Sequence, residues 1–226
     1  MGLESSRSKL IPDDIDSFES QLKEQWHKTH MKDSNNTSQG TYESLVGRQG
    51  EYMSIVGTNI RDFFEKNDIK NLKILEVMAG NCLSSLAIKS IIGDHVSSWT
   101  RTDIGDYSKL SVQMDTIDAV KTYGDESNLL LLVSPPPGIF RPLDDKSVAY
   151  YGDYFACKKF IETKKDTDKY IIFVGELGAS DGSEGMYRYL LEHPRLRLCK
   201  RKLTLPNQKD FMGGPLELEL FIFLIN

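Results

Sequence analysis

The sequence predicts an α/β protein with a doubly wound, mostly parallel seven-stranded sheet, a terminal antiparallel hairpin and an N-terminal helical extension. Two observations lead to this prediction. Short apolar runs such as 128–133 (NLLLLV) and 170–174 (YIIFV) are typical of strands buried on both faces, and they alternate with helical patterns. The last apolar run, 216–224 (LELELFIFL), alternates as an antiparallel strand does and follows a strand candidate at 196–205. We therefore expect parallel βαβ units that end in a hairpin at the sheet edge.

The segment 73–88 (KILEVMAGNCLSSLAI) is the unit around which the predicted sheet is organised. Lys73–Val77 is a strand candidate, Met78–Asn81 a tight turn with one glycine, and Cys82–Ile88 the beginning of a helix. Such a unit points free main-chain N–H groups and the positive end of a helix dipole at one place above the strand. Doubly wound proteins bind nucleotides at that place. The segment therefore predicts a binding site at the carboxyl end of the first strand.

The remaining elements follow from hydrophobic periodicity and from breaks at glycine and proline. Glycines 47, 50 and 57 weaken one of the helices, and the sequence leaves open whether they break it or allow a close approach. Asp181 and Glu184 are a candidate capping box for the last helix. The other expected strands span 96–102 and 110–114, and the expected helices span 13–30, 42–64, 116–123, 148–163 and 185–192.

Composition and charge exclude several function classes. The net charge of -5 and the pI near 5.5 argue against a general nucleic-acid surface, and the basic run 195–202 is more simply a solvated strand face. Three widely spaced cysteines predict neither a disulfide framework nor a metal site. No apolar run is long enough for a membrane span, so we expect a cytoplasmic protein. Gly2 and Ser6 fit a myristoylation pattern, but no second membrane signal accompanies them.

Polar residues follow several of the predicted strands. Asp103 follows 96–102, where a carboxylate can accept hydrogen bonds from both ribose hydroxyls; the simpler alternative is a solvated turn residue. Asp115 follows the third strand candidate. The run 134–137 (SPPP) follows the apolar strand 128–133, and its prolines predict a rigid turn that holds Ser134 and the Pro136 carbonyl over the site or, alternatively, only a stiff exit from the strand.

The order of these elements resembles class I S-adenosylmethionine-dependent methyltransferases over roughly residues 50–226, and LEVMAGN is similar to the first motif of that family. The resemblance implies a Rossmann-like methyltransferase domain at 50–226, behind a helical extension and linker at 1–49. It implies S-adenosylmethionine as cofactor, an unknown methyl acceptor as substrate, and a catalytic turn that presents a polar acceptor atom to the methyl group. The implied cofactor-binding residues are Glu76, Met78, Gly80, Asn81, Asp103 (ribose) and Asp115 (adenine), and the implied catalytic residues are Ser134, Pro135 and Pro136.

Three residues depart from the family pattern. Met78 and Cys82 stand where glycines are usual, and Pro137 replaces the aromatic residue that would stack on a flipped base. These departures keep a second hypothesis open, a catalytically inactive Rossmann-like binding or interaction module. A nicotinamide dehydrogenase ranks third, because the full G-x-G-x-x-G turn is missing.

Overall fold

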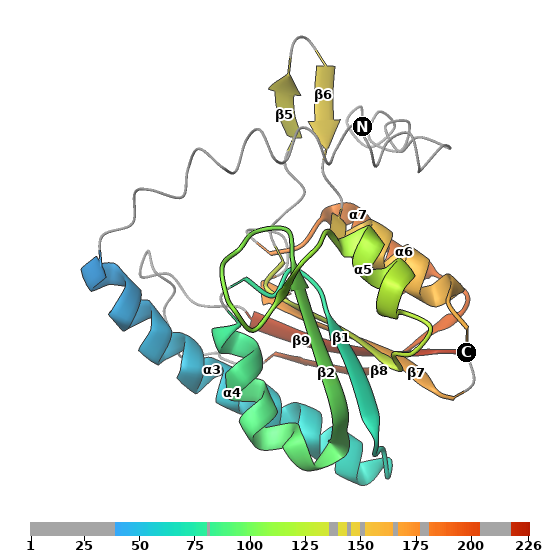
Figure 1. Cartoon of the computed structure of the whole chain (residues 1–226). Coiled ribbons are helices and arrows are strands. Elements are labelled where there is room, and N and C mark those ends of the chain that lie inside the picture. The colour runs from blue at the N-terminus through green and yellow to red at the C-terminus, as the bar shows by residue number, and fades with distance from the viewer. Residues whose placement is uncertain are drawn as a thin grey trace. The chain divides into compact units, whose positions relative to one another are not determined.

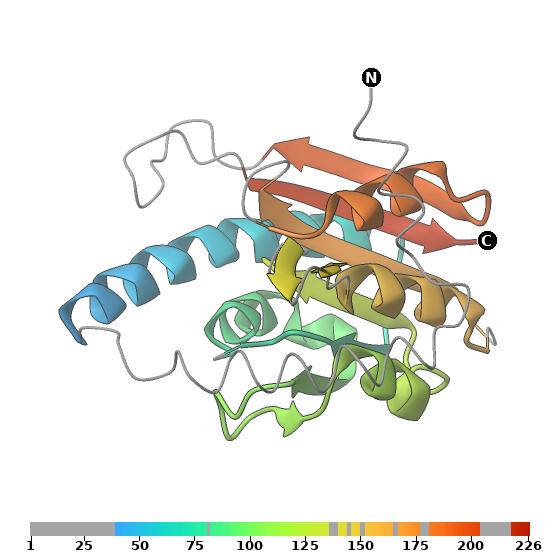
Figure 2. The ribbon, with the colours of Figure 1, turned by 90° about the horizontal axis from the view of Figure 1, so that it is seen from above.

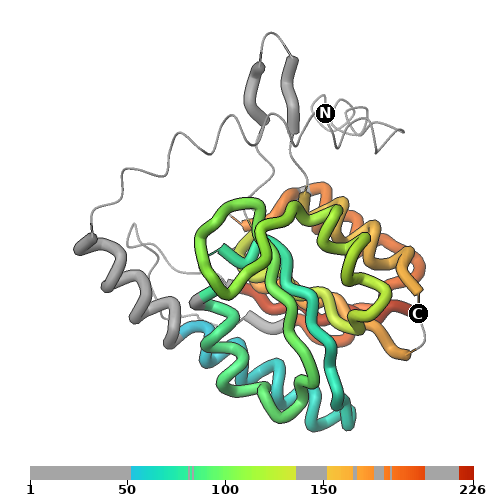
Figure 3. The backbone as a smooth tube through the Cα atoms, in the orientation of Figure 1, coloured from blue at the N-terminus to red at the C-terminus, as the bar shows by residue number. Residues whose placement is uncertain are grey.

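The structure is a computed structural model that describes residues 39–80, 82–135, 140–143, 146–149, 152–164, 167–176, 181–203 and 218–226 (Figure 1), and Figure 3 shows the backbone as a tube in the same orientation. The chain divides into two compact units, 1–43 with 139–150 and 44–138 with 151–226. The first unit contains an antiparallel hairpin of β5 (Phe140–Leu143) and β6 (Lys146–Ala149). The second unit contains the α/β sheet. The expected helix 13–30 lies outside the described residues.

The sheet has seven strands in the order β3-β2-β1-β4-β7-β9-β8. The first five in this order run parallel, and β9 is antiparallel to both β7 and β8. This arrangement confirms the doubly wound, mostly parallel sheet with a terminal antiparallel hairpin. Figure 2 shows β8 and β9 in orange and red at one side of the sheet. The strands are β1 (Leu72–Glu76), β2 (Val96–Asp103), β3 (Val112–Gln113), β4 (Leu129–Val133), β7 (Lys169–Glu176), β8 (Leu196–Leu203) and β9 (Leu218–Ile225).

Helices cover both faces of this sheet (Figure 1). One core joins α3 and α4 to the sheet through Ile60, Ile88 and Ile74, and the other joins α5, α6 and α7 to it through residues such as Phe160 and Phe173. All five of these side chains are 0 to 1% exposed, so both faces are buried, as the continuous apolar strands predict. The helices are α3 (Gln39–Lys66), α4 (Leu83–Ile92), α5 (Thr116–Tyr123), α6 (Gly152–Glu162) and α7 (Glu184–Glu192), and a short 3₁₀ turn, Gly93–His95, follows α4. No helix in the described ranges is long and apolar enough to cross a membrane.

Helix α3 runs without a break through its three glycines. A Cβ at Gly57 would lie 3.1 Å from Cδ1 of Ile91 on α4, which is tighter than ordinary van der Waals contact. The glycine therefore lets α3 and α4 approach closely, which decides between the two alternatives that the sequence left open at this position.

The expected helix 148–163 begins too early. Val148 belongs to β6 and pairs with Arg141 of β5, and α6 begins at Gly152. The apolar periodicity of this region did not reveal the hairpin, because a four-residue strand is too short to show its own period. The third strand is also shorter than expected and contains only Val112 and Gln113.

The capping box predicted for α7 is wrong. Ser183 is the N-cap residue, and its side chain accepts a hydrogen bond from the N–H of Met186 at 3.1 Å. Ser183 has the extended backbone of an N-cap (φ -87°, ψ 143°), and the helix begins at Glu184. Serine is as good a cap as aspartate, so composition alone did not identify the position.

Candidate functional site

Three residues between β1 and α4 have left-handed backbone conformations. Met78, Gly80 and Cys82 have φ values of 57°, 53° and 64°. Non-glycine residues rarely adopt this region, because Cβ approaches the following carbonyl, at a cost of about 1–2 kcal/mol per residue. Met78 and Cys82 therefore keep the backbone conformation that a glycine would adopt freely. Asn81, which the sequence also assigns to the site, lies outside the described residues.

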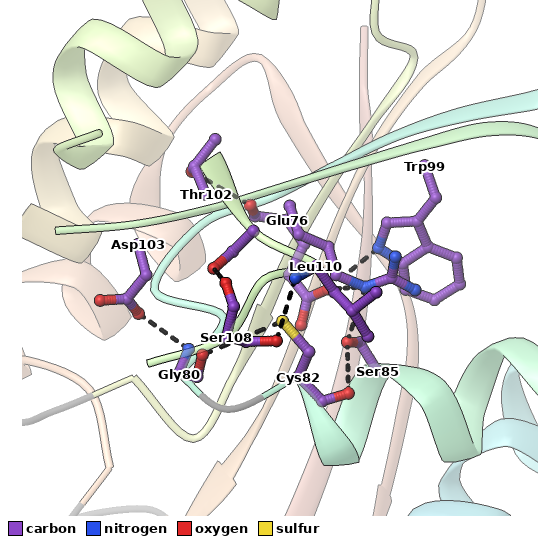
Figure 4. Close-up of polar contacts among 11 residues, drawn as sticks. Glu76, Gly80, Cys82, Ser85, Trp99, Thr102, Asp103, Ser108 and Leu110 are labelled. Atoms are coloured by element: carbon purple, nitrogen blue, oxygen red, sulfur yellow. Dashed lines mark hydrogen bonds and ion pairs between the residues drawn. The ribbon is translucent and has the colours of Figure 1, made fainter. Parts of the chain in front are cut away.

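Asp103 joins the end of β2 to this turn. Its Oδ2 accepts a hydrogen bond from the N–H of Gly80 at 2.8 Å (Figure 4), and its Oδ1 accepts one from the N–H of Gly105 at 2.9 Å. Burial raises the pKa of Asp103, and the two N–H groups oppose this shift. A carboxylate has about four acceptor sites, so these two bonds leave room for a further donor. The structure thus brings together two of the predicted residues, Gly80 and Asp103.

Glu76 points to the other side of the turn, towards Trp99 (Figure 4). It is 1% exposed, and its Oε2 accepts a hydrogen bond from Nε1 of Trp99 at 2.9 Å and lies 3.5 Å from Nε of Arg101. Burial raises the pKa of Glu76 to about 7, although the Trp99 hydrogen bond and the Arg101 charge lower it. Sequence reasoning missed this buried ion pair. The expected contact of Glu76 with a cofactor stays a prediction.

Arg101 connects Glu76 to the first turn of α4. Its Nε donates to Oγ of Ser85 at 3.0 Å, and its guanidinium lies 4.9 Å from the ring centroid of Trp99. Ser85 in turn donates to the carbonyl of Cys82 at 3.0 Å. We call Glu76, Ser85, Trp99 and Arg101 the Glu76 cluster. Because the cluster joins β1, β2 and α4, it holds together the strand and the helix on either side of the left-handed turn.

Cys82 is buried at the end of the turn and is a free thiol. Its Sγ lies 3.9 Å from the carbonyl oxygen of Gly80 (Figure 4). Burial raises the pKa of this thiol, so it is not an activated nucleophile. The side chain adds volume beside the turn without supplying a cap for α4, because the N-cap position makes no side-chain hydrogen bond.

Asp115 caps the first turn of α5. Its Oδ1 accepts hydrogen bonds from the N–H groups of Ile117 at 3.0 Å and Asp118 at 2.9 Å. The preceding residue, Met114, donates its N–H to the carbonyl of Asp103 at 2.7 Å. Asp115 therefore lies near the end of β2, where the resemblance implies the adenine. The contact of Asp115 with adenine stays a prediction, whereas the structure shows that Asp115 caps α5.

Two hydrogen bonds hold the turn after β4. The N–H of Ser134, which has φ 45°, donates to the carbonyl of Val174 on β7 at 2.7 Å. The carbonyl of Pro135 accepts from the N–H of Gly182 at 2.7 Å. We call Ser134 and Pro135 the acceptor turn. Pro136, the third expected catalytic residue, lies outside the described residues.

The predicted residues that the structure describes share one edge of the sheet. The strands β1, β2 and β4 are parallel neighbours, so the turns after them lie at the same, carboxyl edge. A hollow of about 510 Å³ lies elsewhere, lined by residues 67–73, 125–128, 164 and 167–170 at the amino ends of β1, β4 and β7. It contains none of the predicted site residues. No cluster of three or more metal-ligating side chains occurs in the ranges that the structure describes.

Comparison with known proteins finds solved structures with a similar fold. No family model and no curated protein matches the chain. A magnesium protoporphyrin IX methyltransferase of Synechocystis with bound S-adenosylmethionine has 11% identity and a TM-score of 0.49, over 93% of this chain and 94% of that one. The plantazolicin methyltransferase BpumL, in complex with S-adenosylhomocysteine, has 10% identity and a TM-score of 0.49, over 85% and 91%.

A candidate class I S-adenosylmethionine-dependent methyltransferase of Listeria monocytogenes has 11% identity and a TM-score of 0.48, over 76% of this chain. The match spans 59% of the Listeria chain, so that protein is considerably longer. At such identities and TM-scores the likenesses say nothing about activity. The fold assignment rests on the strand order of this chain, which is that of the class I methyltransferase sheet.

Proposed function

We propose that the protein is an S-adenosylmethionine-dependent methyltransferase that binds its cofactor at the turn after β1 and at Asp103. The observation that carries the proposal is the hydrogen bond between the N–H of Gly80 and Oδ2 of Asp103. It places the glycine of the first motif and the acid at the end of β2 beside each other, at the carboxyl edge of a doubly wound sheet, where such folds bind nucleotides.

The chemistry of the donor set fits this cofactor. The Asp103 carboxylate has about four acceptor sites, so it can accept from a ribose hydroxyl while Gly80 and Gly105 hold it in place. Gly80 has no side chain that would keep a ligand away from the main chain. When bound, S-adenosylmethionine supplies an electrophilic methyl group on a sulfonium.

In this proposal the acceptor turn orients the substrate. Ser134 offers a hydroxyl, and the Pro135 carbonyl keeps a second lone pair beyond the one that Gly182 uses. Both groups can direct a polar acceptor atom so that its lone pair faces the methyl group. Fixed orientation is the main contribution that a protein makes to such a transfer.

Met78 and Cys82 favour one alternative, a Rossmann-like module that binds a ligand without catalysis. Both residues adopt left-handed conformations, so the turn keeps its path, but each adds a side chain where the family has none. Extra volume beside the cofactor would displace its reactive part while leaving the Asp103 side of the site intact. The alternative therefore predicts binding without turnover.

Formation of S-adenosylhomocysteine distinguishes the two functions. The protein is incubated with methyl-labelled S-adenosylmethionine and a panel of amines, alcohols and thiols, with Asp103→Asn as the inactive control and Asp106→Asn as the matched control. Asp106 is an exposed acid three residues further along the chain. Acceptor-dependent label transfer that Asp103→Asn loses and Asp106→Asn keeps is expected. Cofactor binding without transfer to any acceptor would instead support the inactive module.

A further inference from the structure

We infer that Asp153 is a positioning residue for the acceptor turn: through Ser183 and Gly182 it fixes the carbonyl of Pro135 and thereby Ser134. The meaning of this inference for catalysis rests on the proposed function, but the coupling itself is a property of the fold. No pattern in the sequence pointed to Asp153, which lies in the first turn of α6.

Asp153 receives three hydrogen bonds while being 1% exposed. Its Oδ2 accepts from the N–H of Ser183 at 2.5 Å, and its Oδ1 accepts from Oγ of Ser183 at 2.9 Å and from the N–H of Tyr154 at 2.8 Å. Burial raises the pKa of Asp153 to about 6, and these donors lower it. A buried carboxylate is costly unless it is fully hydrogen-bonded, so its geometry is closely defined.

The first turn of α6 is itself anchored. Oγ1 of Thr116, the first residue of α5, donates to the carbonyl of Gly152 at 3.2 Å in a buried environment. Asp153 follows Gly152 directly. The carboxylate therefore holds Ser183 from a position that α5 and α6 fix together, instead of moving with α7.

Ser183 passes this restraint to Gly182, its neighbour in the chain. Gly182 has φ +73°, and a Cβ there would lie 2.9 Å from Cε of Met186 and 3.2 Å from the ring of Phe173. The hydroxyl of Tyr187 also donates to the carbonyl of Asp181 at 3.1 Å. The segment 181–183 thus has little room to move independently of Ser183.

Gly182 in turn holds the acceptor turn through its 2.7 Å hydrogen bond to the Pro135 carbonyl. Ser134 has φ 45°, a conformation that is strained for a non-glycine residue and persists only where neighbours support it. Among the residues that the structure describes, the bond of its own N–H to Val174 supports it on one side and the Pro135–Gly182 bond on the other. Loss of the Asp153 anchor therefore weakens the support that the Pro135–Gly182 hydrogen bond gives to Ser134.

Amide hydrogen exchange followed by NMR tests the coupling without a cofactor. In Asp153→Asn, a single acceptor oxygen faces three donors, so Ser183 is no longer fully held. We expect the protection of the Gly182 and Ser134 amides to fall about tenfold or more, while that of Leu75 in β1 stays unchanged. The matched control is Glu162→Gln, an exposed acid on the same helix that pairs with Lys159 at 3.7 Å and should change neither amide.

A second pair of variants, at Ser183, tests the same coupling even if Asp153→Asn does not fold. Ser183→Ala removes the hydroxyl that bonds Asp153 and should expose Gly182 and Ser134, whereas Ser183→Thr keeps a hydroxyl and should restore their protection. Unchanged exchange at Gly182, or an equal loss of protection throughout the sheet, would overturn the inference. A wild-type protein that shows this local coupling but binds no S-adenosylhomocysteine would sink the proposed function and leave the coupling standing.

Discussion

The N–H of Gly80 donates a 2.8 Å hydrogen bond to Oδ2 of Asp103, and this bond joins the turn after β1 to the end of β2. The donor residue has φ 53°, a conformation that glycine adopts without strain. Neighbouring residues at 78 and 82 adopt similar conformations without being glycines. The bond therefore depends on a turn with three left-handed residues, of which only the central one, Gly80, is a glycine.

Replacing Gly80 tests this dependence on backbone conformation. Apart from the two chain neighbours, no atom of the described residues lies within 4 Å of a Cβ built at Gly80 or at Gly93, but Gly80 has φ +53° whereas Gly93 has φ -53°. Gly80→Ala should lower the free energy of unfolding by about 1 kcal/mol, because an L-residue is strained there. Gly93→Ala should leave it unchanged or raise it by up to about 1 kcal/mol. Urea denaturation measures both, and equal effects would show that backbone conformation is not the cause.

Glu76 should make stability depend on pH. Burial raises its pKa in the folded protein from 4.5 to about 7, so the folded state holds a proton that the unfolded state releases between these values. The stability of the wild type relative to Glu76→Gln should therefore fall as pH rises from about 4.5 to 7, by on the order of 2–3 kcal/mol, and level off outside that window. Denaturation curves of both proteins across the window measure the difference.

The exposed Glu65 supplies the control for this pH prediction. Glu65→Gln should show the same pH dependence as the wild type, because this substitution leaves Glu76 buried beside Trp99 and Arg101. A wild type that instead gains stability relative to Glu76→Gln over the same window would mean that the Arg101 charge outweighs burial.

Arg101 should be the costliest residue of the Glu76 cluster to remove. Arg101→Met removes the cation that lowers the pKa of Glu76, so this buried carboxyl group takes up a proton or stays unpaired; the variant should lose about 1 kcal/mol more stability near pH 8 than near pH 5, where Glu76 is protonated in both proteins. The double variant Glu76→Gln/Arg101→Met should be more stable than Arg101→Met alone. Thermal unfolding of the three variants at both pH values checks this, and additive losses would contradict a direct pairing.

Asp115 has a structural role that can be separated from its expected contact with adenine. Asp115→Ala removes the cap of α5 and should lower stability by about 1 kcal/mol, whereas Asp115→Asn keeps an acceptor oxygen and should be nearly neutral. If Asp115 also contacts the adenine amino group, Asp115→Asn should weaken ligand binding without a loss of stability. Parallel thermal unfolding and ligand titrations separate the two roles.

The sheet could be predicted from the sequence because each central strand is a continuous apolar run that is recognisable on its own. Runs such as Leu129–Val133 are apolar on both faces, and only a doubly covered strand buries them. Asp103 was predicted because its place at the end of β2 follows from the strand itself. Side-chain direction was harder: Glu76 is the last residue of β1 and points to the α4 side, where Trp99 and Arg101 of the neighbouring strand pair with it.

Contacts between distant segments were missed for the same reason. Asp153 and Ser183 are thirty residues apart and meet only because α6 and α7 begin at the same edge of the sheet. Gly182 and Pro135 likewise become partners through the pairing of β4 with β7. No local pattern in the chain encodes either contact, whereas a cap such as Asp115 is encoded within three residues.

Isothermal titration of the wild-type protein with S-adenosylhomocysteine and S-adenosylmethionine tests the central claim most directly. Asp103→Asn serves as the site variant and Asp106→Asn as the matched control. We predict micromolar binding, about 8 kcal/mol, that Asp103→Asn loses and Asp106→Asn retains. A wild type that is folded by circular dichroism and gives no heat with either ligand, or that binds them equally well without the Asp103 carboxylate, would contradict the account.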